Sequence, residues 1–126
     1  MDAKDMTGQV LEIEGTQAVC IIQTPTKRIY AAVDDSIVDM TWEEAQEWCK
    51  AQFNGKGHCP DRAELMWLFA YYKDKVNNRA DWYWTSEKVY NHPTNSWLLL
   101  WTIGNIDPDY RPYNYSVRAF YTESLI

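Results

Sequence analysis

Hydrophobic and polar residues alternate along three short segments near the start of the chain, and a period of two is typical of half-buried strands. The segments cover 9–14, 18–23 and 28–33, and Gly15-Thr16 separates the first two. A tight turn between two such segments indicates a β-hairpin. The pattern therefore predicts an N-terminal hairpin and a third strand, followed by an acidic connection over 34–39.

After residue 40 the apolar residues recur at helical spacing. Thr41 with Glu44 three positions later forms a capping-box pattern, which marks the start of a helix, and Asp61 with Glu64 repeats it. We expect the first helix to end at 54–57 and the second at 77–78. The predicted buried stripes are Trp42, Ala45, Trp48, Cys49 and Phe53 on the first helix, and Leu65, Leu68, Phe69, Tyr72 and Val76 on the second.

The last third of the chain returns to a strand pattern. It predicts strands over 82–89, 96–103 and 113–122, joined by loops over 90–95 and 104–112. Strands followed by two helices and then more strands are typical of an α+β domain. We expect one compact fold, in which 1–32 form an N-terminal β-hairpin extension and 33–126 form the main body.

The composition adds two constraints. The 126 residues include 7 Trp and 9 Tyr, and a net charge of -6 disfavours nucleic acid and anionic membranes as partners, because phosphate contacts need clustered Lys and Arg. The start of the chain lacks a signal-peptide pattern, and the longest apolar run is too short for a bilayer, so we expect neither a signal peptide nor membrane insertion. The tryptophans expected in the core are Trp42, Trp48, Trp67, Trp84 and Trp97.

The three cysteines are an odd number, so they do not make a complete disulfide framework. Pairing of Cys49 with Cys59 stays open at this point. No Cys-x-x-Cys pair is present, and we expect no metal and no cofactor. Arg118 is expected to be structural, with Glu64 or Glu87 as its acidic partner.

Six short motifs follow one another between residues 33 and 121. They are Thr41-Trp42-Glu43-Glu44-Ala45, Pro60-Asp61-Arg62-Ala63-Glu64-Leu65, Tyr83-Trp84-Thr85-Ser86-Glu87, Ser96-Trp97, Gly104-Asn105 and Val117-Arg118-Ala119-Phe120. In this order they resemble the C-type-lectin-like domains of phage tail proteins, bacterial surface proteins and the variable proteins of diversity-generating retroelements. One departure is Gly57-His58-Cys59-Pro60, where the family usually has Trp-Arg-Leu-Pro. The resemblance implies a C-type lectin-like fold with two helices packed on a small antiparallel sheet.

Retroelement variable proteins randomise chosen adenine-containing codons, and the resulting residues exclude Lys, Glu, Gln, Met and Trp. The stretch from Thr102 to Val117 contains none of these five. The resemblance therefore implies a hypervariable receptor-binding surface. It also implies a location on a virion tail or cell surface, with a protein or carbohydrate of a cell surface as ligand.

Alternation along 96–103 predicts that Trp97, Leu99 and Trp101 face the core and that Leu98 and Leu100 face outward. Exposed leucines suit a binding face, but a strand buried on both sides fits the same pattern. Tyrosine adds large contact area at a low entropic cost. The candidate ligand-binding residues are Leu98, Leu100, Thr102, Asp107, Asp109, Tyr110, Tyr113, Asn114, Tyr115, Tyr90, Asn91 and His92.

Three other functions compete with ligand binding as interpretations of the sequence. The same fold hosts formylglycine-generating enzymes, but these depend on cysteines late in the chain and none follows Cys59, so we do not expect an enzyme. Asp107-Pro108-Asp109 offers two carboxylates to calcium, yet the Glu-Pro-Asn, Gln-Pro-Asp and Trp-Asn-Asp strings of calcium-dependent lectins are missing. A structural role, in which the N-terminal hairpin docks on a larger phage or surface particle, is compatible with binding.

Overall fold

The computed structural model describes residues 3–126 and has the α+β architecture that the sequence predicts. Met1 and Asp2, where the predicted N-terminal extension begins, lie outside the described residues. The helices are α1 (Trp42–Gly55) and α2 (Arg62–Tyr72), followed by the short 3-10 helix η1 (Lys73–Lys75). The strands are β1 (Val10–Ile13), β2 (Thr16–Gln23), β3 (Lys27–Ala32), β4 (Trp82–Lys88), β5 (Asn95–Leu100), β6 (Asn105–Tyr110) and β7 (Phe120–Ser124).

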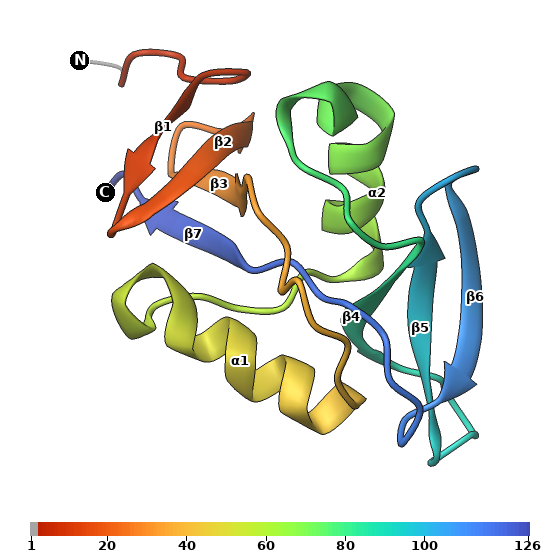
Figure 1. Cartoon of the computed structure of the whole chain (residues 1–126). Helices are drawn as coiled ribbons and strands as arrows, with labels where there is room; N and C mark the ends of the chain where they lie inside the picture. The colour runs from red at the N-terminus through yellow and green to blue at the C-terminus, as the bar shows by residue number, and fades with distance from the viewer. Residues whose placement is uncertain (1–2) are drawn as a thin grey trace.

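The strands form two separate antiparallel sheets (Figure 1). The predicted hairpin is confirmed as β1 and β2, and β3 follows as the third strand. The last strand returns to this sheet, because β7 pairs with β3 and places Tyr30 opposite Tyr121. The second sheet has the order β4-β5-β6. The division of the chain at residue 33 stays a prediction, and the structure adds that β3 shares a sheet with the C-terminal strand.

Both capping boxes are confirmed. The Glu44 amide donates to the Thr41 hydroxyl at 3.3 Å, and the Thr41 amide donates to the Glu44 carboxylate at 3.0 Å. Asp61 and Glu64 exchange the same two bonds at the start of α2. These contacts satisfy backbone N–H groups that have no partner inside the helix.

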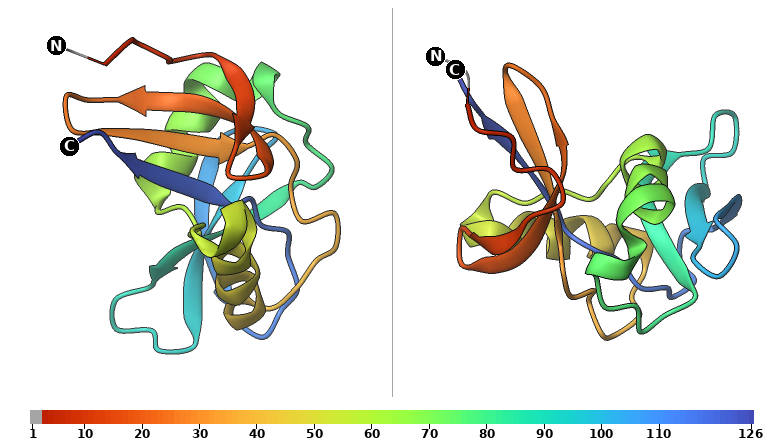
Figure 2. Two further views of the ribbon diagram at one scale, coloured as in Figure 1. Left: turned by 90° about the vertical axis from the view of Figure 1, so that its left-hand side faces the viewer. Right: turned by 90° about the horizontal axis from the view of Figure 1, so that it is seen from above.

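The helix α2 lies between the two sheets (Figure 2), contacting β2 on one side and β4 and β5 on the other. Its residues Leu65 and Leu68 are fully buried, as the helical stripe predicts. Trp67 departs from the prediction that it lies in the core, since 44% of it is exposed. Its indole N–H instead donates to the Ile21 carbonyl at 3.0 Å, which attaches α2 to the β1-β2-β3-β7 sheet, called here the N-terminal sheet.

Arg118 is completely buried and joins parts of the chain that are far apart in sequence. Its guanidinium donates to the carbonyls of Val33 and Asn77, each at 2.7 Å. The prediction that Glu64 or Glu87 is its acidic partner is wrong. Glu64 caps α2, and Glu87 of β4 pairs with Arg62 at the start of α2. Burial lowers the pKa of Arg118. The carbonyl acceptors satisfy its two terminal nitrogens, whereas its buried Nε has no hydrogen-bond partner.

The predicted boundaries of the C-terminal strands are wrong in two places. The predicted loop 104–112 contains β6, and the predicted strand 113–122 is regular only from Phe120. Pro108 is tolerated within β6 because this strand lies at the edge of its sheet. A backbone position that faces away from β5 has no neighbouring strand to which an N–H could donate. Residues 111–119 form an irregular segment that crosses the molecule. The Trp84 backbone amide donates to the Ser116 carbonyl of this segment at 2.9 Å.

The three cysteines are free thiols and all are buried. Cys49 lies beside Cys59 in the core around α1, but the two are not bonded covalently. Within residues 3–126, no helix combines the length and the apolar character that a membrane crossing requires.

Candidate ligand-binding face

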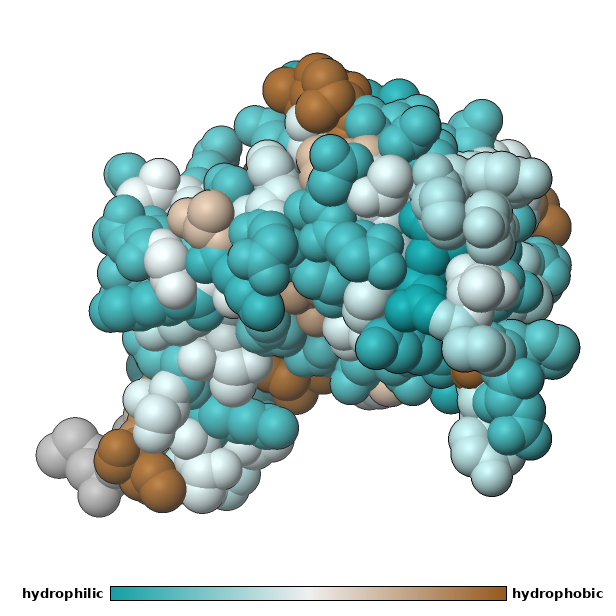
Figure 3. Space-filling view, turned by 90° about the horizontal axis from the view of Figure 1, so that it is seen from below, coloured by the Kyte–Doolittle hydropathy of each residue, from teal (hydrophilic) through white to brown (hydrophobic). Residues whose placement is uncertain are grey.

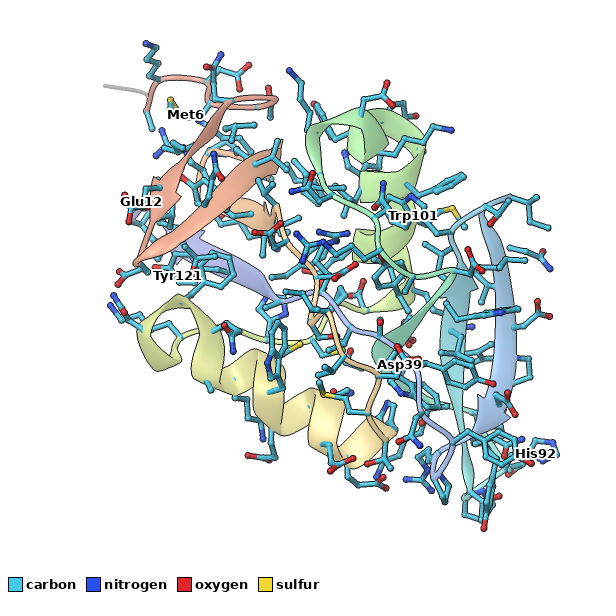
Figure 4. The ribbon with its side chains drawn as sticks, in the orientation of Figure 1. Met6, Glu12, Asp39, His92, Trp101 and Tyr121 are labelled. Carbon is cyan, nitrogen blue, oxygen red and sulfur yellow. The ribbon has the colours of Figure 1, made fainter. Side chains whose placement is uncertain are left out.

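Two turns come together at one end of the β4-β5-β6 sheet. One connects β4 to β5, and the other follows β6. The Arg111 amide donates to the Thr94 carbonyl at 2.8 Å, which holds the two turns side by side. We call this region the tyrosine end, and Figure 4 shows His92 at its tip. The tyrosine end consists of Tyr90, Asn91, His92, Tyr110 and Tyr113.

Aromatic rings dominate the surface of the tyrosine end. Tyr110 and Tyr113 pack edge to face with ring centroids 5.4 Å apart, and they remain 43% and 55% exposed. The Tyr113 amide donates to the Tyr110 carbonyl at 3.0 Å, so a backbone bond closes the turn that carries both rings. Tyr90 is 88% exposed on the neighbouring turn. Rings held in place before binding lose little conformational entropy when a ligand arrives.

Tyr115 belongs to the irregular segment after β6 and is anchored against the same sheet. Its ring lies 5.2 Å from that of Trp84 and 6.3 Å from that of Trp82, centroid to centroid. Its hydroxyl donates to the Asp109 carboxylate on β6. Burial, together with this carboxylate, raises the pKa of Tyr115 to about 12, so the phenol loses its proton only at strongly alkaline pH. Tyr115 therefore forms part of the scaffold as well as part of the surface.

An open hollow of about 510 Å³ adjoins Tyr115. Its wall comes from the connection before α1, from the segment leading into β4 and from the segment that follows β6. The lining residues are Ile37, Val38, Asp39, Arg79, Ala80, Asp81, Trp82, Asn114, Tyr115 and Ser116. We call this feature the Ile37 hollow.

The rim of the Ile37 hollow has a strained backbone. Ile37 has a φ of 68°, and the Val38 amide donates to the Ser36 carbonyl at 2.7 Å, which makes a tight γ-turn. A β-branched residue is rarely found at positive φ, where its side chain crowds the backbone. The turn nevertheless exposes 63% of Ile37 and 61% of Val38. The surrounding structure must hold this conformation in place.

Two buried polar residues hold the turn. The Asp35 carboxylate accepts from the Ile37 amide at 3.0 Å and from the Tyr83 hydroxyl at 2.7 Å. The Ser36 hydroxyl lies 3.2 Å from the Val117 amide and accepts its hydrogen bond. Strain of this kind persists only where neighbouring contacts over-determine it, and it concentrates at binding sites.

The hollow carries more negative than positive charge. The Asp39 carboxylate accepts from the Ser116 hydroxyl at 2.7 Å through one oxygen, and Asp81 is exposed. Arg79 is the cation of the lining, and its guanidinium lies 3.9 Å from the Asp34 carboxylate. Figure 4 shows Asp39 beside the segment that leads into β7.

The expected outward position of Leu98 is wrong. Leu98 is 1% exposed and Leu99 is fully buried, so the middle of β5 is buried on both faces, as the alternative interpretation allowed. The physical reason is that residues 111–119 and the α1 region cover the face that alternation assigns to solvent. Leu100 is half-buried between its strand partners Trp82 and Asn105.

The other predicted residues do not form one cluster. Thr102 is exposed in the turn at the opposite end of β5 and β6 from the tyrosine end. Asp107 is half-buried in β6 and accepts from the Asn105 side chain at 2.9 Å. Asn114 and Tyr115 line the Ile37 hollow. Asp109 is half-buried in β6 and accepts from the Tyr115 hydroxyl. The remaining five residues make up the tyrosine end.

Most of the hollow was not predicted from sequence. A detectable signal was the apolar pair Ile37-Val38 inside an acidic connection, because such a pair has no place in a plain solvated loop. Ala80, Asp81 and Trp82 had no comparable signal, since long-range packing alone brings them to the hollow.

Among residues 3–126, no group of three His, Cys, Asp or Glu side chains has a spacing that suits a metal ion. His58 belongs to neither the tyrosine end nor the Ile37 hollow. Its Nδ1 lies 3.1 Å from the Cys59 carbonyl, and its Nε2 lies 3.1 Å from the Thr122 hydroxyl. Comparison with known proteins finds no matching family model and no matching curated relative.

Proposed function

We propose that this chain is a ligand-binding domain that presents a variable surface on a C-type lectin-like scaffold. The surface consists of the tyrosine end and the adjoining Ile37 hollow. The ligand is a protein or carbohydrate on a cell surface, and binding requires neither a cofactor nor catalysis.

The positions of the motif residues support the scaffold part of this proposal. Trp42, Trp84 and Phe120, which belong to three of the motifs, are all buried in the core. Two helices with small antiparallel sheets support the α+β part of that arrangement, although the chain has two such sheets and the resemblance implies one. These three motif residues therefore belong to the core that determines the fold.

The observation that carries the binding proposal is the separation of the tyrosine end from the core. Tyr90, Tyr110 and Tyr113 are exposed, whereas the strands beneath them are fixed by Trp84, Leu99 and their neighbours. Large aromatic side chains on a closed, hydrogen-bonded turn are typical of binding surfaces. Their exchange for other residues leaves the buried contacts intact.

Sequencing of the same locus from many isolates tests the diversified part of the proposal. We expect substitutions to concentrate at the exposed codons for Tyr90, Tyr110, Tyr113 and Asn114, with a near-copy template repeat and a reverse-transcriptase gene nearby. Substitutions spread equally over the codons of buried residues such as Leu99, with no template repeat, would contradict it.

A cell-surface binding assay tests the recognition itself. The labelled domain is applied to arrays of glycans and cell-surface proteins, and the double variant Y110S/Y113S is compared with the unchanged chain. We expect the variant to lose its array signals while its melting temperature falls by no more than several degrees, the small cost of the packed Tyr110–Tyr113 pair. A matched control, Y71F on α2, should keep both, because Tyr71 is 65% exposed far from the turns.

The N-terminal sheet offers a second surface for the assembly role. It lies on the opposite side of the molecule from β6 in the views of Figures 1 and 2. Docking through β1 would therefore leave the tyrosine end free. Incorporation into a reconstituted particle should fall for Val10→Lys at the outer strand β1 and should be unaffected by Y110S/Y113S.

A further inference from the structure

We propose that the Ile37 hollow binds a lysine or arginine side chain of the partner protein. The inference rests on the proposed binding function and specifies the chemistry that one part of the surface recognises. It is carried by the shape of the hollow, its apolar and aromatic wall, and its charges.

The first argument is the built-in geometry of the rim. Ile37 has a φ of 68°, although glycine or asparagine would adopt this backbone without comparable strain. Asp35 and Ser36 are 3% and 7% exposed, and they are committed to holding the turn. The result is an exposed isoleucine and valine at the edge of an open hollow.

The second argument is the nature of the wall. Ile37, Val38 and Ala80 offer aliphatic contact, and the rings of Trp82 and Tyr115 lie beside them with centroids 6.3 Å apart. On the side of the molecule seen in Figure 3, hydrophobic residues appear as small separate patches on a largely hydrophilic surface. A combined aliphatic and aromatic wall suits the methylene stem of a long side chain.

The third argument is charge complementarity. Asp39 and Asp81 contribute two carboxylates. Among the described residues of the lining the cation is Arg79, whose guanidinium lies 3.9 Å from Asp34, a residue that does not line the hollow. One oxygen of Asp39 is free of the bond to Ser116. A cation next to these carboxylates and over an indole ring gains both ion-pair and cation–π attraction. The net charge of -6 favours approach of a basic partner over an acidic one.

A side chain fits this description better than a free ion does. The hollow measures about 510 Å³ and has an apolar wall that a bare cation would leave unused. Lysine and arginine combine a long apolar stem with a terminal charge. We therefore assign the hollow to a basic residue that protrudes from a protein partner.

Blocked tripeptides provide the probe. The ¹⁵N-labelled domain is titrated with acetyl-Leu-Arg-Leu-amide, acetyl-Leu-Lys-Leu-amide, acetyl-Leu-Gln-Leu-amide or acetyl-Leu-Glu-Leu-amide, and amide and indole shifts are recorded. We expect the two basic peptides to shift the Trp82 indole and the Ser116 and Asn114 amides, with a Kd on the order of 1 mM. The Glu peptide should leave these signals unchanged, and added salt should weaken the basic peptides.

Charge variants sharpen the test. D39N/D81N should weaken the arginine peptide about tenfold, because it removes both exposed carboxylates that pair with the cation and leaves the Trp82 ring in place. E12Q/E47Q removes the same charge from exposed sites on β1 and α1, and it should change the affinity less than twofold. The dispersion of the amide spectrum verifies that each variant is folded.

The possible outcomes distinguish failure of this inference from failure of the proposed ligand-binding function. Equal shifts by the Gln and Arg peptides, or equal affinities of D39N/D81N and E12Q/E47Q, overturn the assignment to a basic side chain. Shifts confined to Tyr90, Tyr110 and Tyr113 also overturn it, yet they leave the proposed binding function standing. If no peptide binds anywhere, the inference fails, and the locus sequencing and array assay decide the proposed function independently.

Discussion

The Tyr83 hydroxyl donates a hydrogen bond of 2.7 Å to the buried Asp35 carboxylate. This contact links the middle of the molecule to its surface, because Tyr83 belongs to β4 and Asp35 holds the turn at Ile37. Both residues are almost inaccessible to solvent. The exposed rim of the hollow is therefore fixed by a bond within the core.

Removal of this bond should weaken the fold and add a pH signature. Tyr83→Phe should lower the free energy of unfolding by about 1–2 kcal/mol at neutral pH, because the carboxylate loses a buried donor. Burial and Asp35 raise the pKa of Tyr83 from its ordinary 10.0 to about 12. The raised pKa favours the protonated phenol in the folded state.

The contribution of this shift is complete below pH 10 and is lost as the pH rises toward 12. Urea unfolding as a function of pH should show a smaller alkaline loss of stability in Tyr83→Phe than in the unchanged chain. Tyr71→Phe is the control, since Tyr71 is 65% exposed. Identical alkaline profiles for both variants would contradict the buried role of Tyr83.

Arg118 should be far more sensitive than an arginine at the surface. Arg118→Met should cost about 3–5 kcal/mol of unfolding free energy, because the carbonyls of Val33 and Asn77 lose their donors. Arg62→Met removes a partly exposed pair with Glu87 and should cost no more than about 1 kcal/mol. Chemical denaturation of the two variants checks this order, and similar losses would show that the buried contacts matter less than described.

Leu98 offers a direct test of which way β5 faces. Leu98→Ala should cost about 2–5 kcal/mol, because the side chain is 1% exposed and leaves a cavity. Leu100→Ala should cost less, since Leu100 is only half-buried. Thermal or urea unfolding of both variants decides the matter. A loss for Leu98→Ala below that for Leu100→Ala would restore the outward position that alternation predicts.

Much of the fold was predictable because it is encoded locally. The capping boxes at Thr41 and Asp61 each lie within four residues, so the sequence is sufficient to find them. The strand β6 escaped prediction because Pro108 and three polar neighbours resemble a loop, whereas pairing with β5 makes the segment extended. Tertiary pairing here overrides a weak local preference.

The site was less predictable because its geometry is set at long range. The exposure of Tyr110 and Tyr113 agrees with their prediction as surface residues. Leu98 faces the core because residues 111–119 cover it, a contact that no periodicity reports. The position of Ile37 depends on a positive φ imposed by Asp35, and Trp82 reaches the hollow only through packing.

Relief of the backbone strain at Ile37 should leave the fold at least as stable as it is in the unchanged chain. Ile37→Gly should leave the unfolding free energy unchanged or raise it by up to about 1 kcal/mol, because glycine accepts positive φ and this gain offsets its greater freedom when unfolded. Val38→Gly, at ordinary φ, should lower it by about 1 kcal/mol. Equal destabilisation by both substitutions, measured by urea unfolding, would show that the turn is unstrained.

The measurement closest to the central claim is the unfolding free energy of Y90S/Y110S/Y113S/N114S, which alters four exposed positions together. The account predicts a loss of no more than about 1.5 kcal/mol, mostly from the packed Tyr110–Tyr113 pair. A loss of about 4 kcal/mol or more, comparable to that of Leu98→Ala, would show that these side chains hold the fold together and do not form a replaceable binding surface.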